Sequence, residues 1–424
     1  MKNRKFAGAV VVLLSFRIFL LVLFTPPCCS SDEGVYHSLA KNLVTKNTFI
    51  VTQTDVGGIW KEEVYGVKPP LYPFFLAAIY KTFGVNHTIA KVFQIILAVV
   101  TGILIYQLTK LFFLKKIAII SLLIFALFWE IASINTLLLS ENLYWLLLTM
   151  LVYTLFKAIA QQTNYSLIIL SGCILGLLTL TRPVSLGLII PIGFWLFINR
   201  TNFKSAVILI LTIIFFSLLT ITPWTLRNYH IYNQFVFIYT DGNINIWMGN
   251  SDGSGGTYRI PKPEDPNQTP VLLTTGVQQE IERNNFYYSK ALSYIINNPL
   301  GALNMAIRKT FGTFGTYRPI TFLSTRYRSN HIILPRSLGI DAFFEFLVSY
   351  QFAIFSLSFF LGITTVVTKK KVNKYHWLFI FLLSWHLLSI AATHFEYRYI
   401  THMYPLMIPF SAITIHSLLK VFRK

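Results

Sequence analysis

Two adjacent acids, Asp32 and Glu33, are the first residues of this chain whose types and spacing could do chemistry. They stand in SSDEGVYHSLAKNL, directly after the first hydrophobic run. Ser30 or Ser31 can cap a helix there, which would place both acids in a first turn that favours ionised carboxylates. An ionised carboxylate at a membrane boundary can orient an acceptor hydroxyl and take its proton. The alternative is an acidic first turn that only starts a surface helix.

Lys68, in GVKPPLYPFF, is a candidate cation for a phosphate group. The two prolines that follow it lack backbone donors and stiffen the approach to the next helix. We therefore expect the ammonium to stay at headgroup height, where lipid phosphates lie. The alternative is an ordinary lysine whose stem covers apolar surface while its charge reaches water.

Further ionisable residues fall at the expected outer ends of hydrophobic spans: Arg182, Arg227 in TPWTLRNY, and Glu396 and Arg398 in HFEYRY. Charged groups near a membrane are costly and are usually paired or functional. Arginine can grip a phosphate with two parallel N–H donors, so Arg227 and Arg398 are candidates for a phosphate clamp. The alternative is that Glu396 and Arg398 pair with one another.

Two other charges have weaker signals. Glu141, in LLSENLYW, opens a span on the same outer side, either as a second acid of the site or as a favourable charge at a helix N-terminus. Arg17 lies deeper and could reach an acid of another span. No phosphate-binding loop, GxSxG or HExxH motif occurs, and the histidines form no metal-ligand pattern. We assign no metal ligand, and a divalent cation stays an open alternative.

The composition indicates what positions these residues. The chain has 424 residues, of which 54% are hydrophobic and 12% charged, so it is a multi-pass integral membrane protein. The net charge of +20 is scattered over span ends rather than gathered in one polar patch, so nucleic acid is not an expected partner. Three cysteines are too few for a disulfide scaffold.

Ten apolar runs predict an all-α bundle of about ten transmembrane helices. Lys and Arg collect on alternate loops, which places both termini in the cytoplasm and the charged residues above on the outer face, most simply of a bacterial plasma membrane. The expected organisation is one membrane domain, 1–424, with exoplasmic segments at 26–87 and 223–345. The ten runs are 6–25, 88–110, 117–134, 139–160, 165–181, 184–199, 204–222, 346–368, 375–393 and 402–421.

The two outer segments are expected to contain juxtamembrane helices. LYPFFLAAIYKTFG, after Lys68, is too short to span and should lie in the membrane interface. A second helix is predicted from Gln278 to Asn297, ended by Pro299, with an apolar stripe that packs on the membrane face. Between them, the Gly/Asn-rich stretch DGNINIWMGNSDGSGG has little capacity for regular structure.

Taken together, the chain resembles the GT-C glycosyltransferases of the protein O-mannosyltransferase and lipid A aminoarabinose transferase type. The similar strings run in order along the sequence. They are DEGVY, VKPPLYPFFLAAIYKTFGVN, SENLYWLLL, LTLTRP, TPWTLRNYHIYNQFVFI, GNINIWMGN, NPLGALNMAIRK and FEYRYITHMYPL.

The resemblance implies an inverting transfer of one sugar from a polyprenyl-phosphate donor to a hydroxyl of a lipid, glycan or protein outside the cytoplasm. It implies that Asp32 is the catalytic base and that Lys68 contacts the donor phosphate. From their residue types and positions we also predict that Glu33 is catalytic and that Arg227 and Arg398 bind the donor phosphate. We further predict that Tyr36, Glu141, Asn250 and Glu396 bind the sugar or the acceptor. Val67 stands where some relatives carry an acid, which weakens an inherited metal site.

Several other functions were weighed against this one. A transporter or flippase should carry charges at the bilayer midplane and paired halves, whereas these charges lie at span ends. A membrane acyltransferase would use an embedded histidine such as His386, for which packing is the simpler reading. A lipid-linked glycan polymerase or ligase is the remaining alternative within glycosyl transfer.

Overall fold

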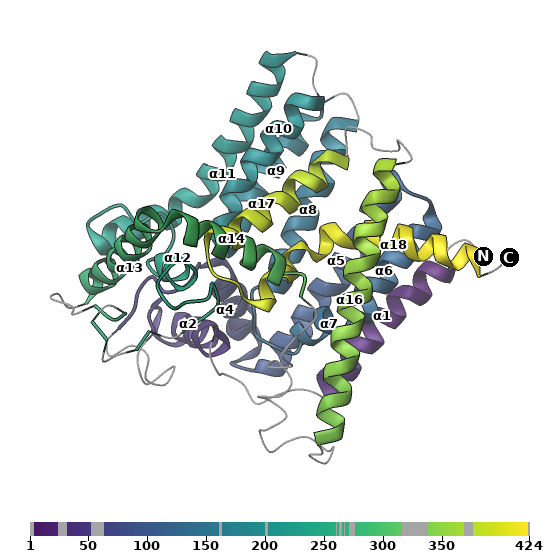
Figure 1. The fold of residues 1–424 in the computed structure, drawn as a ribbon. Helices are drawn as coiled ribbons and strands as arrows, with labels where there is room; N and C mark the ends of the chain where they lie inside the picture. The colour runs from purple at the N-terminus through teal and green to yellow at the C-terminus, as the bar shows by residue number, and fades with distance from the viewer. Residues whose placement is uncertain are drawn as a thin grey trace.

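The computed structural model describes the chain over most of its length and is helical almost throughout (Figure 1). Among the residues that the structure describes, the only β pairing is two isolated bridges, Val51 with Val64 and Thr257 with Phe395. Ser30, Ser31, Cys28 and Cys29 lie outside the described residues. The described residues are 4–23, 32–51, 63–160, 163–199, 202–259, 261–262, 265–266, 268–270, 276–315, 338–368 and 376–422.

Among the described residues, six helical segments are long and apolar enough to cross a membrane, which confirms the polytopic all-α class. Three shorter apolar helices accompany them: α9 (Tyr165–Thr181), η1 with α10 (Pro183–Leu188, Ile189–Asn199) and α17 (His376–Ala392). The six lie on α1 (Arg4–Leu23), α5 (His87–Phe112), α8 (Glu141–Ala160), α11 (Phe203–Tyr232), α16 (Leu338–Thr368), and η2 with α18 (Tyr397–Met403, Tyr404–Val421).

The expected span 117–134 is wrong as one helix. The chain breaks at Phe128 into α6 (Lys115–Leu127) and α7 (Trp129–Ile134). The side chain of Gln351 satisfies the interrupted backbone, because it accepts from Trp129 N at 2.8 Å and donates to Leu127 O at 3.1 Å. A glutamine on α16 thus supplies partners that a continuous helix would have provided itself.

α11 also differs from the expected span 204–222, since it continues through Pro223 to Tyr232. Trp224 and Asn228 are buried beyond that proline. Asn228 donates to the carbonyls of Val236 and Ile238, at 3.1 and 2.9 Å. Tertiary contacts of this kind carry the helix past the residue that usually stops one.

Arg17 does not reach an acid, contrary to the expectation for it. Its Nη2 donates to the carbonyl of Phe125 at 2.8 Å, and its guanidinium lies 5.6 Å from the centre of that residue's ring. A carbonyl at the end of α6 and an aromatic face therefore accommodate this buried cation.

The two long segments between the apolar runs contain the expected short helices and two more. α2 (Asp32–Lys46), α4 (Leu71–Phe83) and α13 (Val277–Asn297) match the predictions. The Gly/Asn-rich stretch was wrongly expected to be irregular, because its residues Asn243–Gly249 form α12 around the buried Trp247. Pro299, expected only as a stop, begins α14 (Pro299–Gly312), where a proline fits the first turn.

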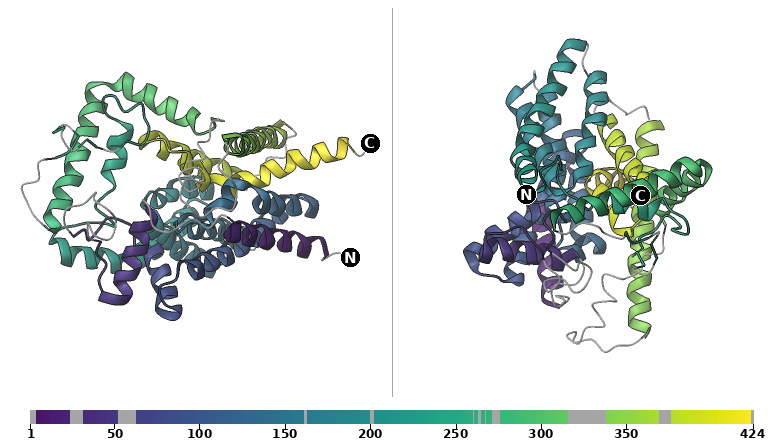
Figure 2. Two further views of the ribbon diagram at one scale, coloured as in Figure 1. Left: turned by 90° about the horizontal axis from the view of Figure 1, so that it is seen from below. Right: turned by 90° about the vertical axis from the view of Figure 1, so that its left-hand side faces the viewer.

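These short helices gather on one side of the bundle. α2, α4, α12 and α13 lie together at the left of Figure 1, and the start of α1 and the end of α18 lie on the opposite side; the left view of Figure 2 agrees. α8 is central, with 78% of its spanning window buried, whereas only 28% of that of α11 is. Apolar side chains of α11 such as Phe215 and Leu219 are exposed, as lipid-facing residues are.

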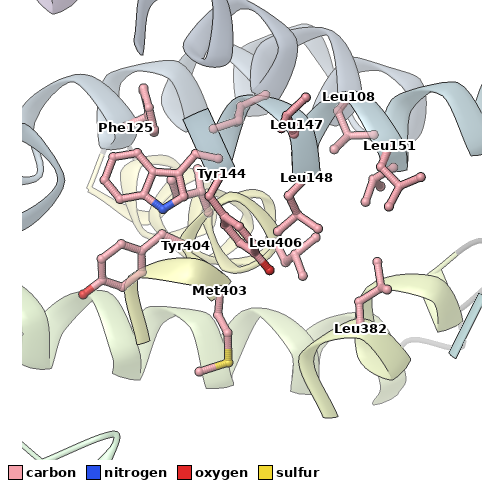
Figure 3. Close-up of a cluster of buried hydrophobic side chains, with 14 of the residues drawn as sticks. Leu108, Phe125, Tyr144, Leu147, Leu148, Leu151, Leu382, Met403, Tyr404 and Leu406 are labelled. Carbon is pink, nitrogen blue, oxygen red and sulfur yellow. The ribbon is translucent and has the colours of Figure 1, made fainter. Parts of the chain in front are cut away.

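The core fixes the start of α8 against η2. Tyr144, Leu148 and Leu151 of α8 belong to the same buried hydrophobic cluster as Met403 and Leu406 (Figure 3). Trp145 Nε1 also donates to the carbonyl of Thr401 at 2.8 Å. The packing therefore determines how the first residue of α8, Glu141, lies relative to Arg398 in η2.

Candidate active site

Asp32 stands at the centre of the candidate site. Its Oδ1 accepts from Lys68 Nζ at 2.9 Å, and its Oδ2 accepts from Arg398 Nη2 at 2.7 Å. The three residues come from the start of α2, the approach to α4 and η2, so the fold brings together distant parts of the sequence. Both carboxylate oxygens are engaged by cations.

Glu141 and Glu396 extend this arrangement through the same arginine. Arg398 Nε lies 3.4 Å from a carboxylate oxygen of each. Glu141 is also 2.9 Å from Arg182 Nη2 and is completely buried. We call these six residues the Asp32 cluster: Asp32, Lys68, Glu141, Arg182, Glu396 and Arg398.

The charges of the Asp32 cluster balance. Asp32, Glu141 and Glu396 provide three negative charges, and three cations oppose them. Neither oxygen of Glu141 makes a hydrogen bond within the described residues, so charge alone relates it to the arginines. The cluster has no net charge and is partly buried. An anion can therefore bind to it only if one of the carboxylates releases its ion pair with a cation.

The electrostatics of Asp32 follow from this geometry. Burial alone would raise the pKa of Asp32, but Lys68 and Arg398 outweigh it and hold that pKa well below its usual range. For Lys68, burial would lower the pKa, and Asp32 with smaller contributions from its neighbours raises it above its usual value. Asp32 is therefore ionised at neutral pH but, bound to two cations, is a weak base.

Tyr36 lies in the site one turn after Asp32. Lys68 Nζ is 5.9 Å from the centre of its ring, a cation–π distance, and its hydroxyl is 3.4 Å from Ser140 Oγ. Ser140 directly precedes Glu141, so Tyr36 connects α2 to the start of α8. The structure therefore places Tyr36 between Lys68 and the Glu141 side of the cluster.

Glu33 points away from the site, which does not fit its prediction as a second catalytic acid. Its carboxylate is buried and accepts from the backbone N–H of Leu138 at 2.7 Å. The helical spacing explains the difference, because neighbours on a helix face directions about 100° apart. Glu33 joins α2 to the chain just before α8.

Arg227 does not meet Lys68 and Arg398 in a clamp, contrary to the expectation. Its guanidinium stacks 4.5 Å from the centre of the Trp224 ring and donates to the carbonyl of Tyr65 at 3.2 Å. These contacts join α11 to the chain ahead of Lys68. Arginine serves such stacking and carbonyl contacts as well as it serves phosphate, so its residue type could not decide the role.

Asn250 likewise has a structural position rather than a place in the cluster. Its side-chain amide donates to the carbonyls of Ile246 and Ala392, both at 2.8 Å, and its oxygen accepts from Lys309 Nζ at 3.2 Å. Burial lowers the pKa of Lys309 to about 8. This pair fastens α12 and α14 to the loop that leads to Glu396.

A buried acid that the sequence did not single out positions Lys68. Glu280 on α13 accepts from the backbone N–H groups of Tyr65 and Gly66, at 2.6 and 3.1 Å. It also accepts from Tyr232 Oη at 2.9 Å and Thr240 Oγ1 at 2.6 Å. We call these five residues the Glu280 cluster. Its only sequence signal was the place of Glu280 in an amphipathic helix.

Metal binding has no ligand set among the described residues. There, no group of three or more His, Cys, Asp or Glu side chains could hold a metal ion.

Comparison with known proteins relates this geometry to a family. Residues 67–226 match the family model of dolichyl-phosphate-mannose-protein mannosyltransferase. The matched range includes Lys68, Glu141 and Arg182, whereas Asp32 and Arg398 lie outside it. No curated protein sequence matches the chain.

The fold is similar to that of a solved archaeal oligosaccharyltransferase. The apo oligosaccharyltransferase of Archaeoglobus fulgidus aligns with a TM-score of 0.61 and 11% identity, over 100% of this chain and 52% of that one. The same enzyme with an inhibitory peptide and a dolichol-phosphate gives 0.58 and 12%, over 100% and 51%. ArnT from Cupriavidus metallidurans bound to undecaprenyl phosphate gives 0.44 and 12%, over 97% and 77%.

The chain therefore has a GT-C glycosyltransferase fold, as the sequence motifs indicated. It spans about half the length of the archaeal oligosaccharyltransferase that it matches.

Proposed function

We propose that the chain is a glycosyltransferase that moves one sugar from a polyprenyl-phosphate donor to an acceptor hydroxyl on the exoplasmic side of the membrane. One observation carries the proposal: the carboxylate of Asp32 lies between Lys68 and Arg398, 2.9 and 2.7 Å away. A phosphate-linked donor needs cations, and an attacking hydroxyl needs a base beside them.

In the proposed reaction the acceptor oxygen attacks the anomeric carbon of the sugar from the side opposite the phosphate. The carbon–oxygen bond to phosphate breaks, and the lipid phosphate leaves with the electron pair and one more negative charge. Lys68 and Arg398 stabilise that charge. The hydroxyl proton passes to Asp32, and the configuration at the anomeric carbon inverts.

The ion pairs of Asp32 imply that the donor must bind before Asp32 can act as a base. In the unliganded cluster both oxygens of Asp32 are bound to the cations that the donor needs. The donor phosphate must therefore replace Asp32 at Lys68 and Arg398, which frees the carboxylate and raises its pKa towards that of a useful base. Donor binding thus activates the base by competing with it.

The orientation in the membrane is part of the proposal. The Asp32 cluster lies with the short helices α2 and α4, on the side of the bundle away from the start of α1 and the end of α18 (Figures 1 and 2). The distribution of Lys and Arg in the sequence assigns those two ends to the cytoplasm. The active site then faces outward.

The test is transfer by the purified protein in liposomes. Undecaprenyl-phosphate hexoses and pentoses serve as donors, and lipid and glycan extracts of the host envelope as acceptors. Asp32→Asn should lower turnover about 100- to 10,000-fold, the usual contribution of a general base. Asp252→Asn, at an exposed acid of the second outer segment, is the control. Normal turnover by Asp32→Asn would refute the assignment.

A lipid-linked glycan ligase is the second candidate, because the fold also matches an oligosaccharyltransferase. A ligase would use a diphosphate-linked oligosaccharide and should leave monosaccharide phosphates unused. Mass spectrometry of the product separates the two, since one adds a single sugar and the other a whole glycan.

A further inference from the structure

The turn at Asp241, in the Gly/Asn-rich stretch, is fixed beside Lys68 by its backbone. Thr240 N donates to the carbonyl of Gly66 at 2.8 Å, and Thr240 Oγ1 donates to Glu280. Gly66 precedes Lys68 by two residues. The backbone bond therefore brings the residue that follows Thr240 next to the approach to Lys68.

The other side of the turn is fixed to α13. Asn243 N donates to Asn284 Oδ1 at 3.1 Å, and Asn243 Nδ2 donates to the carbonyl of Asn284 at 3.2 Å. Asp241 is therefore confined between two attachment points, and Arg283 of α13 lies next to the second. Both side chains are half-buried, so a ligand can reach them.

Asp241 and Arg283 differ from the residues of the Asp32 cluster because neither forms an ion pair with another described residue. Within the described residues, Asp241 makes no ion pair or side-chain hydrogen bond, and the buried Nη2 of Arg283 has no hydrogen-bond partner. Burial raises the pKa of Asp241, although Arg283 and Lys68 act in the opposite direction. The backbone bond from Thr240 to Gly66 therefore places a carboxylate that has no ion pair among the described residues beside the approach to Lys68.

The chemistry of this pair selects a neutral ligand. A second phosphate would be repelled by Asp241, whereas a hydroxyl group can donate to the carboxylate and accept from the guanidinium. Since the buried Nη2 of Arg283 has no hydrogen-bond partner within the described residues, a ligand hydroxyl that accepts from it and donates to Asp241 gains affinity. A sugar carries several hydroxyls and is bonded directly to the phosphate that Lys68 would bind.

We propose that Asp241 and Arg283 form the subsite that recognises hydroxyl groups of the transferred sugar. This inference rests on the proposed function, because it uses the assignment of Lys68 to the donor phosphate. It assigns the selection of the sugar to the second outer segment, whereas Lys68 of the first outer segment and Arg398 of η2 bind the phosphate.

The test compares lipids that differ only in the sugar. Dissociation constants are measured for undecaprenyl phosphate and for its mannosyl, glucosyl, galactosyl and aminoarabinosyl derivatives, with the wild type, Asp241→Asn and the control Asp252→Asn. We expect at least one sugar lipid to bind the wild type better than the bare lipid. In Asp241→Asn, the ratio of the dissociation constants of the bare lipid and the preferred sugar lipid should fall by about 10- to 100-fold. The dissociation constant of the bare lipid should change by less than about twofold.

Three results would overturn the inference. They are an undiminished sugar preference in Asp241→Asn, an equal loss for bare and sugar-bearing lipids, and a wild type that prefers none of the sugar lipids. If the wild type does not bind even the bare lipid, the proposed function fails first.

Arg283→Gln is the second variant, and it should reduce the same preference. An unchanged acceptor KM in both variants assigns the subsite to the donor sugar, whereas a raised KM with the donor preference intact would contradict that assignment.

Discussion

Asp32 and Glu280 are both acids that join distant parts of the chain, and their partners differ. Asp32 is bound to the cations Lys68 and Arg398, at 2.9 and 2.7 Å. Glu280 accepts from neutral donors, including the backbone of Gly66 and the hydroxyl of Thr240. An anionic ligand can replace a carboxylate at a cation, but it has little to gain from replacing one that neutral donors already satisfy.

This difference in partners indicates that the Asp32 cluster binds the ligand and that the Glu280 cluster holds the surrounding chain in position. The Asp32 cluster can exchange partners when a phosphate arrives, whereas the Glu280 cluster keeps the approach to Lys68 in place throughout. Distance from the chemistry does not make the second cluster less important, because a small displacement of a positioned group is expensive. Variants of the two clusters should therefore fail in different ways.

Glu280→Ala should have the largest effect on stability. It leaves two backbone N–H groups and two hydroxyls without their acceptor, so we expect a loss of about 3 kcal/mol or more in the free energy of unfolding. Thermal unfolding in detergent measures this, with the exposed Asn285→Ala on the same helix as control. A Glu280→Ala protein as stable as the control would show that the Glu280 cluster does not stabilise the fold.

Lys68→Ala should act chiefly on lipid binding, in addition to the loss of one ion pair of Asp32. Loss of one charge-assisted bond to phosphate should weaken undecaprenyl phosphate binding about 10- to 100-fold. Lys46→Ala, at an exposed lysine of α2, is the matched control. Unchanged affinity in Lys68→Ala would remove this lysine from the phosphate site.

Acid should expose the contribution of the Asp32 ion pairs. The pKa of Asp32 is lower in the folded protein than in the unfolded chain, so its contribution is complete above the unfolded value of about 4. It is then lost as the pH falls towards the folded value. The stability difference between the wild type and Asp32→Asn should therefore shrink between about pH 5 and pH 3. A difference that grows on acidification would contradict the pairing.

Arg227→Gln should have the smallest effect on lipid binding. The guanidinium contacts Trp224 and the carbonyl of Tyr65, so its loss should cost about 1 kcal/mol of stability. The dissociation constant of undecaprenyl phosphate should change by less than about twofold. A tenfold loss in affinity with unchanged stability would restore Arg227 to the phosphate site.

Local patterns in the sequence predicted much of the fold. Hydrophobic runs of spanning length located the bundle helices, and capping and proline signals located α2, α4 and α13. The break at Phe128 could not be predicted in this way, because Gln351, which satisfies it, lies on another helix. The extension of α11 past Pro223 likewise depends on tertiary contacts.

Residue type and position alone could not separate the roles of the charged residues. Asp32 and Glu33 are neighbours in one helical turn, yet one meets Lys68 and the other the backbone of Leu138. Arg227 and Arg398 both fall at span ends, and only Arg398 meets Asp32. The roles of Glu280 and Asp241 depend on pairings between distant segments, which a single sequence does not display.

Exchange of Asp32 for a lipid phosphate at Lys68 and Arg398 is tested most directly by one binding measurement. The affinity of undecaprenyl phosphate is compared between the wild type and Asp32→Asn, in the absence of acceptor and of any sugar. If Asp32 competes with the phosphate, removing its charge should tighten binding, by about tenfold or more. Unchanged or weaker binding by a folded Asp32→Asn protein would contradict the account.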